Sequence, residues 1–204
     1  MKKRSLTKST CKNIHKFASS KNDSTVIVES GLEFDACFHF EFSNNVKFFE
    51  SQPLGFEYYY LNKWRRYTPD FLVHFTDNTK RYFEVKPLNK TLSPEFQSKF
   101  NAIQRQSNEI QLELITEPVI RKLPLIQNLK LLHKYSELEP NTMIMEKIRW
   151  LKPGEKVSIM HISRTLCMEL YTIIPHILKL VGMHQFNIEM SKPFSGESKI
   201  WRLL

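Results

Sequence analysis

Two short segments of the sequence place acidic and basic side chains at spacings that suit phosphodiester hydrolysis. Asp70 follows Pro69, Glu84 lies fourteen positions later, and Lys86 is two residues beyond it. Because alternate residues of a strand point to the same face, Glu84 and Lys86 would share one face of an extended segment. Mg²⁺ prefers carboxylate oxygens, and a neighbouring ammonium can orient water and stabilise charge on a phosphate. The set therefore predicts metal-dependent cleavage of a phosphodiester.

A third carboxylate comes from a predicted helix over residues 29–43, where apolar or small side chains recur every four residues. Glu33 lies on this helix, and Glu29, one turn away, is a weaker rival. Each motif alone also occurs by chance, since an Asp after Pro is commonly a turn residue and a Glu–Lys pair is commonly solvated. The ordered set is more specific, because lone charges seldom flank buried strands.

The elements that must position these residues read as a mixed α/β core. Alternating and aromatic-rich segments predict strands over residues 46–50, 56–61, 64–75 and 81–86, with turns at 62–63 and 77–78. We expect a meander of antiparallel hairpins, with Asp70 near the middle of one strand and Glu84 on the next. Ser93 and Pro94 then predict a capped helix start, and residues 110–115 predict a further strand.

The pattern changes after Pro118, where leucine and lysine dominate. Helices are predicted over residues 123–135, 142–151, 158–166 and 169–181, and strands over 183–189 and 199–203. Three helices followed by a hairpin with a polar tip are typical of a winged helix-turn-helix. We therefore divide the chain into a flexible basic arm (1–22), an endonuclease domain (23–117) and a winged-helix domain (118–204).

The charge distribution indicates a polyanionic partner, with a net charge of +9 and a pI of about 9.4. Residues 1–22 carry seven Lys or Arg and no acid, whereas residues 23–118 carry ten basic and fourteen acidic residues. An acidic centre suits a metal site, and basic flanks attract DNA by counterion release, although basic tails also serve solubility. Lys63, Arg65 and Arg66 are weaker candidates for phosphate contacts; the alternative is a plain exposed strand.

Several function classes lack sequence support. No apolar run approaches the roughly 18 residues of a membrane span, and no apolar segment follows the basic start as in a secretion signal. The cysteines are three and none form a CxxC pair, which disfavours a disulfide framework and a zinc finger. The seven histidines show no paired ligand spacing, and no phosphate-binding glycine loop occurs. We expect a cytoplasmic protein with reduced thiols.

Four segments resemble the TnsA family, the endonuclease subunit of heteromeric Tn-seven-type transposases. They are residues 28–33 (VESGLE), 50–53 (ESQP), 66–73 (RYTPDFLV) and 83–87 (FEVKP). The resemblance implies a restriction-endonuclease-like PD-(D/E)xK core. It implies that Glu33, Asp70, Glu84 and the carbonyl of Val85 bind Mg²⁺ or Mn²⁺, as two ions, and that Lys86 acts on the water. Some members carry Gln at the position of Glu84.

The same resemblance implies a role in cut-and-paste transposition. The chain would cut the 5′ ends (the non-transferred strands) of a transposon, and a DDE-type, TnsB-like transposase would cut and join the 3′ ends. The carboxy-terminal domain would engage an AAA+ ATPase regulator of the TnsC type, and the protein would be bacterial and nucleoid-associated. Two alternatives stay open: a stand-alone restriction-type or junction-resolving nuclease, and a non-catalytic winged-helix DNA-binding or assembly protein.

Overall fold

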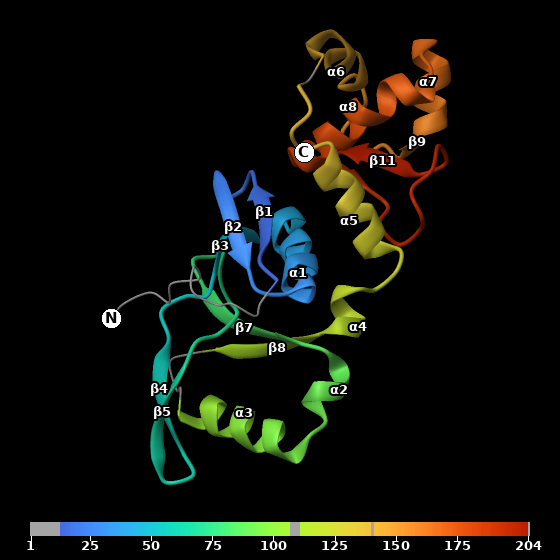
Figure 1. Cartoon of the computed structure of the whole chain (residues 1–204). Helices are drawn as coiled ribbons and strands as arrows, with labels where there is room; N and C mark the ends of the chain where they lie inside the picture. Colours follow the sequence, from blue (N-terminus) through green and yellow to red (C-terminus); the bar gives the residue numbers. More distant parts are fainter. Residues whose placement is uncertain (1–12, 107–110, 140, 204) are drawn as a thin grey trace. The chain divides into compact units, whose positions relative to one another are not determined.

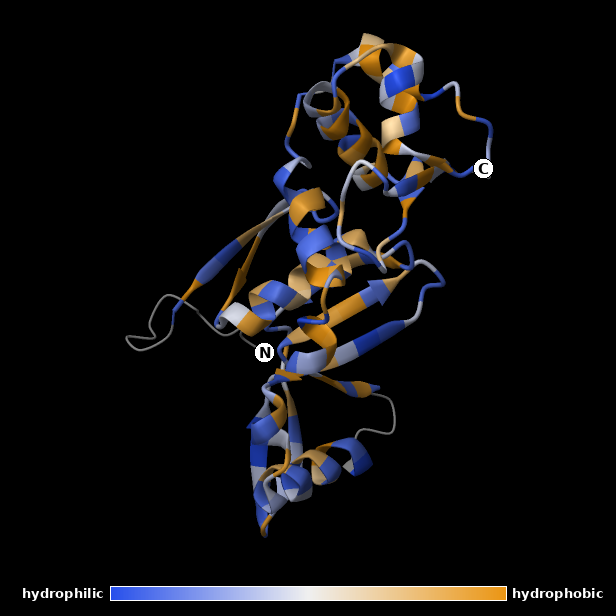
Figure 2. Ribbon diagram, turned by 90° about the vertical axis from the view of Figure 1, so that its right-hand side faces the viewer, coloured by the Kyte–Doolittle hydropathy of each residue, from blue (hydrophilic) through white to orange (hydrophobic). Residues whose placement is uncertain are grey.

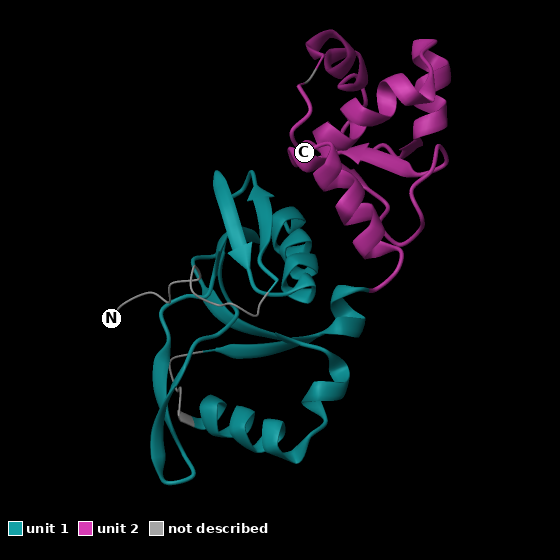
Figure 3. Cartoon of the chain, in the orientation of Figure 1, with its two compact units in different colours: residues 1–121 teal, residues 122–204 magenta. Residues whose placement is uncertain are grey.

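The computed structural model describes residues 13–106, 111–139 and 141–203 (Figure 1). The chain is mixed α/β with several small sheets, and it divides into two compact units, residues 1–121 and 122–204 (Figure 3). The break lies four residues beyond the predicted domain boundary. None of the helices in the described ranges is long and apolar enough to cross a membrane.

Unit 1 contains the strands and helices that surround the predicted site. In chain order they are β1 (His15–Ser19), β2 (Ser24–Val28), α1 (Gly31–Phe42), β3 (Val46–Ser51), β4 (Phe56–Tyr60), β5 (Lys63–Tyr67), β6 (Phe71–Phe75), β7 (Lys80–Lys86), α2 (Leu88–Thr91), α3 (Pro94–Gln106), β8 (Leu112–Thr116) and α4 (Glu117–Ile120).

A four-stranded sheet in the order β3–β6–β7–β8 forms the centre of unit 1. β7 and β8 run parallel, and the other neighbours are antiparallel. Helix α1 covers one face, where the Phe40 ring packs against Phe49, Phe71 and Phe83 from three different strands. Alternate positions of the strands supply these rings, so the period-two pattern of the sequence builds this core.

The hairpin β4–β5 and helix α3 lie on the other side of the central sheet from α1 (Figure 1). Tyr58 and Tyr67 of the hairpin are buried against Ile103 of α3 and Leu112 of β8. The predicted helix start is confirmed, because the Ser93 hydroxyl accepts a hydrogen bond from the Phe96 backbone N–H at 3.2 Å. This second core fixes the base of the hairpin beside the central sheet.

The prediction of one strand over residues 64–75 is wrong. Strand β5 ends at Tyr67 and pairs with β4 as a separate hairpin, whereas β6 begins at Phe71 and pairs with β3 and β7. Pro69 lies in the break, and proline has no N–H to donate to a ladder. The strands therefore do not form one meander, and Asp70 lies just before β6 rather than inside a strand.

The prediction that residues 1–22 form a flexible arm is wrong for the part that the structure describes. Strand β1 begins at His15 and pairs with β2, and the Phe17 side chain is fully buried. Phe17 packs edge-on against Phe38 of α1, so apolar burial holds this segment on unit 1. Residues 1–12, the rest of the predicted arm, lie outside the described residues.

Unit 2 packs helices on a small antiparallel sheet. Its elements are α5 (Leu125–Lys134), α6 (Thr142–Ile148), β9 (Val157–Ser158), α7 (Ile159–Leu166), α8 (Leu170–Gly182), β10 (Phe186–Ile188) and β11 (Lys199–Arg202). The strand order is β10–β11–β9. The sequence patterns located the four helices and the last two strands but missed β9, which has only two residues. The winged helix-turn-helix assignment stays a prediction.

Candidate active site

Asp70 lies at the point where the chain leaves the hairpin and enters the central sheet. Its carbonyl accepts a hydrogen bond from the Gln52 backbone N–H at 2.9 Å. Its Oδ2 atom accepts another from the Val85 N–H at 2.8 Å. These contacts attach the Asp70 backbone to the residue that follows β3 and the Asp70 carboxylate to β7.

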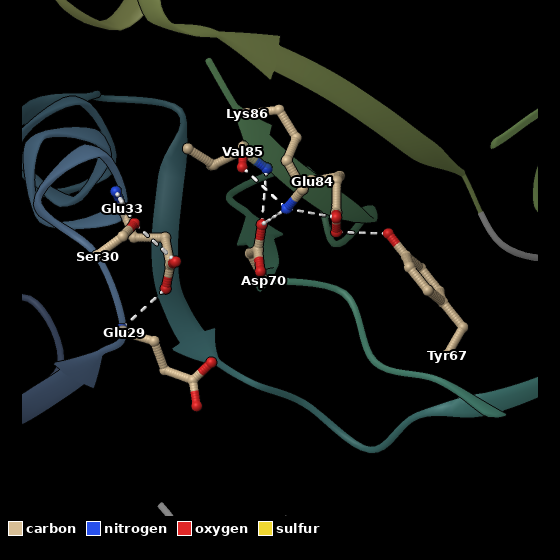
Figure 4. A network of polar contacts seen from close by, with 8 residues as sticks. All are labelled: Glu29, Ser30, Glu33, Tyr67, Asp70, Glu84, Val85 and Lys86. Atoms are coloured by element: carbon tan, nitrogen blue, oxygen red, sulfur yellow. Dashed lines mark hydrogen bonds and ion pairs between the residues drawn. The ribbon is translucent and has the colours of Figure 1, made fainter. Parts of the chain in front are cut away.

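Glu84 and Lys86 share one face of β7, as their spacing predicts. The Lys86 Nζ atom lies 2.6 Å from Glu84 Oε1 and 3.3 Å from Asp70 Oδ2. It also donates to the carbonyl of Val85 at 3.1 Å. The structure therefore brings Asp70, Glu84 and Lys86 into one network (Figure 4).

The electrostatics of this network are dominated by burial of two carboxylates beside one ammonium. Asp70 and Glu84 expose 8% and 7% of their surface. Burial raises the pKa of Asp70 to about 7; the Glu84 carboxylate adds to this rise and the Lys86 ammonium opposes it. Burial lowers the pKa of Lys86, but the two carboxylates outweigh this effect and raise that pKa above its usual value. The site thus carries an excess of negative charge that a cation would relieve.

Tyr67 is a site residue that the sequence patterns did not reveal. Its hydroxyl donates a short hydrogen bond to Glu84 Oε2. Burial, with Glu84 beside it, raises the pKa of Tyr67, so the phenol stays protonated and acts as a donor. The available signal was its position three residues before Asp70, but an aromatic residue at a strand end is usually read as packing.

Glu33 lies across from this network, on α1, and is held by its own helix end (Figure 4). Ser30 caps α1 by accepting from the Glu33 N–H at 3.1 Å. The Glu33 carboxylate in turn accepts from the Ser30 hydroxyl at 2.8 Å and from the Glu29 N–H at 3.0 Å. This is a variant of the capping box. Its negative charge also raises the pKa of Asp70, although no contact joins it to Asp70, Glu84 or Lys86.

The oxygen atoms of this network are of the kind that bind a hard divalent cation. Asp70, Glu84 and the carbonyl of Val85 supply oxygen ligands of the kind that Mg²⁺ binds. Within the described ranges, no group of three or more His, Cys, Asp or Glu side chains is arranged to hold a metal. The role of Glu33 as a ligand therefore stays a prediction. Its carboxylate would first have to leave the helix end.

A cavity of about 580 Å³ lies beside the site rather than at it. Strands β2 and β3 line it, and Gln52 marks its boundary nearest the acids. Gln52 bonds Asp70 through the backbone, but Asp70, Glu84 and Lys86 do not line this cavity.

The other predicted contact residues lie on the hairpin. Lys63, Arg65 and Arg66 are exposed on β5, so they are placed on the strand that leads to Tyr67 and the site. The described histidines take part in no metal-binding group; His39, for example, pairs with the carbonyl of Ile120 at 2.7 Å.

Comparison with known proteins gives one finding. No curated protein matches the chain. Residues 43–117 match the family model of the TnsA-like endonuclease N-terminal domain. The matched segment contains Tyr67, Asp70, Glu84 and Lys86, whereas Glu33 precedes it. Residues 43–117 of the chain are thus similar to the TnsA-like endonuclease N-terminal domain.

Proposed function

We propose that the chain is a Mg²⁺-dependent DNA endonuclease that serves as a transposase subunit and cuts the 5′ ends of a transposon. The match to a TnsA-like endonuclease domain supports a nuclease. The observation that carries the proposal is the network of Asp70, Glu84 and Lys86, in which two buried carboxylates and an amine converge within hydrogen-bonding distance.

The cation would be held by Asp70, Glu84 and the Val85 carbonyl. A second ion would bind Glu33. A bound Mg²⁺ supplies Lewis-acid stabilisation of phosphate charge and lowers the pKa of water. The Val85 N–H keeps the Asp70 carboxylate in place, and Tyr67 does the same for Glu84. With a cation on the carboxylates, the Lys86 N–H groups that now bond Asp70 and Glu84 would instead donate to the attacking water and to a phosphate oxygen, where the positive charge offsets the charge that develops.

The remaining residues of the chain would place this chemistry at the right DNA end. We assign unit 2 the role of a winged-helix domain that engages an AAA+ ATPase regulator, DNA, or both. A DDE-type transposase would cut the other strand. The helices α6, α7 and α8 and the hairpin β10–β11 support this assignment by their order. Cleavage of one strand per end is safest when assembly with these partners completes the site.

Strand-resolved cleavage at labelled transposon ends tests the proposal, with and without the partner transposase and with Mg²⁺ or EDTA. We expect 5′-end cuts that need both Mg²⁺ and the partner, and that Asp70→Asn abolishes. Asp77→Asn is the matched control, because Asp77 is exposed at the β6–β7 turn.

The same assay separates the alternatives. Robust nicking of arbitrary plasmid by the chain alone would favour a stand-alone nuclease. Unchanged cutting by Asp70→Asn in the complete system would reject the assigned centre. No cutting by the wild-type complex at any divalent ion would favour a DNA-binding assembly protein.

A further inference from the structure

The hairpin β4–β5 has two faces of different character. On the inner face, Tyr58 and Tyr67 pack into the second core of unit 1. On the outer face, Tyr59 and Trp64 form a directly paired, edge-to-face couple with ring centroids 5.5 Å apart. In Figure 2, hydrophilic and hydrophobic colours mix along this hairpin. Strand alternation explains the inner aromatics as core packing, whereas the outer pair is a cross-strand aromatic contact on an exposed face.

The outer face and the tip expose large apolar side chains to water. Trp64 exposes 69% of its surface, Leu61 68% and Tyr59 44%. Burying a large apolar side chain is favourable by about 1.5–3 kcal/mol relative to leaving it exposed. Trp64 and Leu61 each go without most of this stabilisation. Three such residues on one hairpin are the mark of a surface that contacts something else.

The turn at the tip adds a second, independent peculiarity. Leu61 and Asn62 have φ values of 49° and 58°, which makes a two-residue turn of the kind that hairpins favour. Asparagine tolerates this left-handed conformation, but leucine adopts it at a cost of roughly 1–2 kcal/mol. Leu61 thus combines a strained backbone with an exposed apolar side chain. Strain of this kind persists where a protruding side chain has a use.

The charges around these apolar groups select the partner. By strand alternation Arg66 shares the outer face with Trp64, whereas Lys63 and Arg65 project from the other face of β5; all three are exposed. Glu57, the acid of the two strands, is the direct cross-strand neighbour of Arg66 on that face. Basic side chains interleaved with exposed aromatic ones suit a nucleic acid, in which phosphates lie beside stacked bases.

The hairpin is also joined directly to the proposed cutting centre. Strand β5 ends at Tyr67, whose hydroxyl bonds Glu84. From Tyr67 to the tip, five residues of strand span about 17 Å, which equals roughly five base pairs of duplex DNA. A duplex that holds one phosphate at the carboxylates and runs parallel to the hairpin would meet the tip about five base pairs away.

We propose that the outer face of β4–β5 is a DNA wedge. Leu61 and Trp64 enter a groove and partly unstack a base step about five base pairs from the cut phosphate, while Lys63 and Arg66 hold the flanking phosphates. The proposal rests on the proposed function in one respect only, namely that the chain binds duplex DNA at its nuclease domain.

Tryptophan fluorescence of the full-length chain tests the wedge without any need for cleavage. The sequence has three tryptophans, and Trp64 is far more exposed than Trp150, at 69% against 44%. On titration with a short duplex at low salt, we expect quenching and protection from acrylamide. Trp64→Phe should lose most of this signal, and Trp150→Phe, the matched control, should keep it.

Affinity and base stacking give a second measurement on the same complex. Trp64→Ala should weaken duplex binding roughly 10-fold, with unchanged circular dichroism. In the complex assembled with Asp70→Asn to prevent cutting, 2-aminopurine placed about five base pairs from the cut position should brighten. That increase should vanish in Trp64→Ala and persist in Lys80→Ala, because Lys80 lies at the opposite end of β7 from Lys86.

Two results would overturn the wedge. One is a Trp64 that stays fully accessible to acrylamide when duplex saturates the chain. The other is a Trp64→Ala variant that loses self-association in sedimentation but retains duplex affinity, which would make the surface a contact between protein chains. If duplex quenches the fluorescence of Trp64 but the complex never cuts DNA, the wedge is supported and only the proposed nuclease activity is rejected.

Discussion

Asp70 and Glu84 place two carboxylates where water hardly reaches, and a single ammonium lies between them. Transfer of charges out of water is costly unless they are paired. Lys86 compensates for one negative charge, and burial together with the other carboxylate raises the pKa of Asp70. Such a centre is stabilised by protons or by cations.

A pH dependence follows for the metal-free chain. The folded pKa of Asp70, about 7, lies above the usual 3.8, so its contribution to stability is fully present below pH 3.8 and is lost as pH rises through 7. Relative to Asp70→Asn at each pH, the wild-type free energy of unfolding should fall by up to about 4 kcal/mol across this window. Urea unfolding at several pH values measures it.

The same pair of proteins tests the cation. At pH 8, Mg²⁺ should raise the melting temperature of the wild type and leave that of Asp70→Asn unchanged, because only the wild type retains the second carboxylate. Equal stabilisation of both proteins would place the cation elsewhere.

Tyr67→Phe should separate positioning of Glu84 from folding. The variant keeps the ring that packs in the second core and removes only the hydroxyl that bonds Glu84. Loss of a group that orients a metal ligand typically costs roughly 10- to 100-fold in activity or metal affinity. We expect this loss in Mg²⁺ titrations of cleavage, with a small change in stability. Tyr60→Phe is the control, since the Tyr60 hydroxyl donates to the exposed Ser98 hydroxyl and not to a site residue.

At the scale of elements, the break between β5 and β6 creates the site. The chain turns at Thr68 and Pro69, so that Tyr67 faces Glu84 from the hairpin and Asp70 approaches β7 from the sheet. Gly55, just before β4, makes this turn possible because the backbones approach closely there. A Cβ at Gly55 would lie 2.4 Å from the Tyr67 carbonyl oxygen.

Gly55→Ala should therefore displace the hairpin base. Backbone must shift to admit the methyl group, at a cost of roughly 1–3 kcal/mol, and cleavage should fall with it because Tyr67 moves. Gly31→Ala is the matched control: the nearest atom to its added Cβ is an arginine nitrogen 4.0 Å away, and alanine favours the helix. Thermal unfolding and cleavage are measured for both variants. A Gly55→Ala variant that is as stable and as active as the wild type would show that the hairpin base is not fixed.

At the scale of the whole molecule, the basic amino-terminal region has two parts, one with most of its charge and one that joins the core. The structure places residues 15–19 in β1, where Phe17 is fully buried. Most of the basic residues of the predicted arm, five of its seven, lie within residues 1–12. Charge and core therefore divide near residue 13.

Two truncations test this division. Removal of residues 2–12 should leave the melting temperature nearly unchanged and flatten the salt dependence of duplex binding, because fewer counterions are released. Removal of residues 2–22 should in addition destabilise unit 1 by several kcal/mol, since a buried Phe is lost at a cost of about 3–5 kcal/mol. If both truncations melt alike, β1 is not part of the core.

The sequence by itself determined the residues that could do chemistry and the elements near them. The apolar step along residues 29–43 and the cap at Ser93 predicted α1 and α3, and the spacing of Glu84 and Lys86 predicted their shared face. Helix faces, caps and strand alternation are local properties, so a single segment contains all the information needed.

Only the tertiary structure decided which strands meet. The aromatic alternation of residues 64–75 continues through the break, so it did not show that β5 joins a hairpin and β6 the central sheet. Strand partners are chosen by long-range pairing and burial rather than by the segment itself. For that reason the contact of Tyr67 with Glu84 left no trace in the local pattern. Glu33, by contrast, is kept at its helix end by the Ser30–Glu33 spacing, which is a local capping signal.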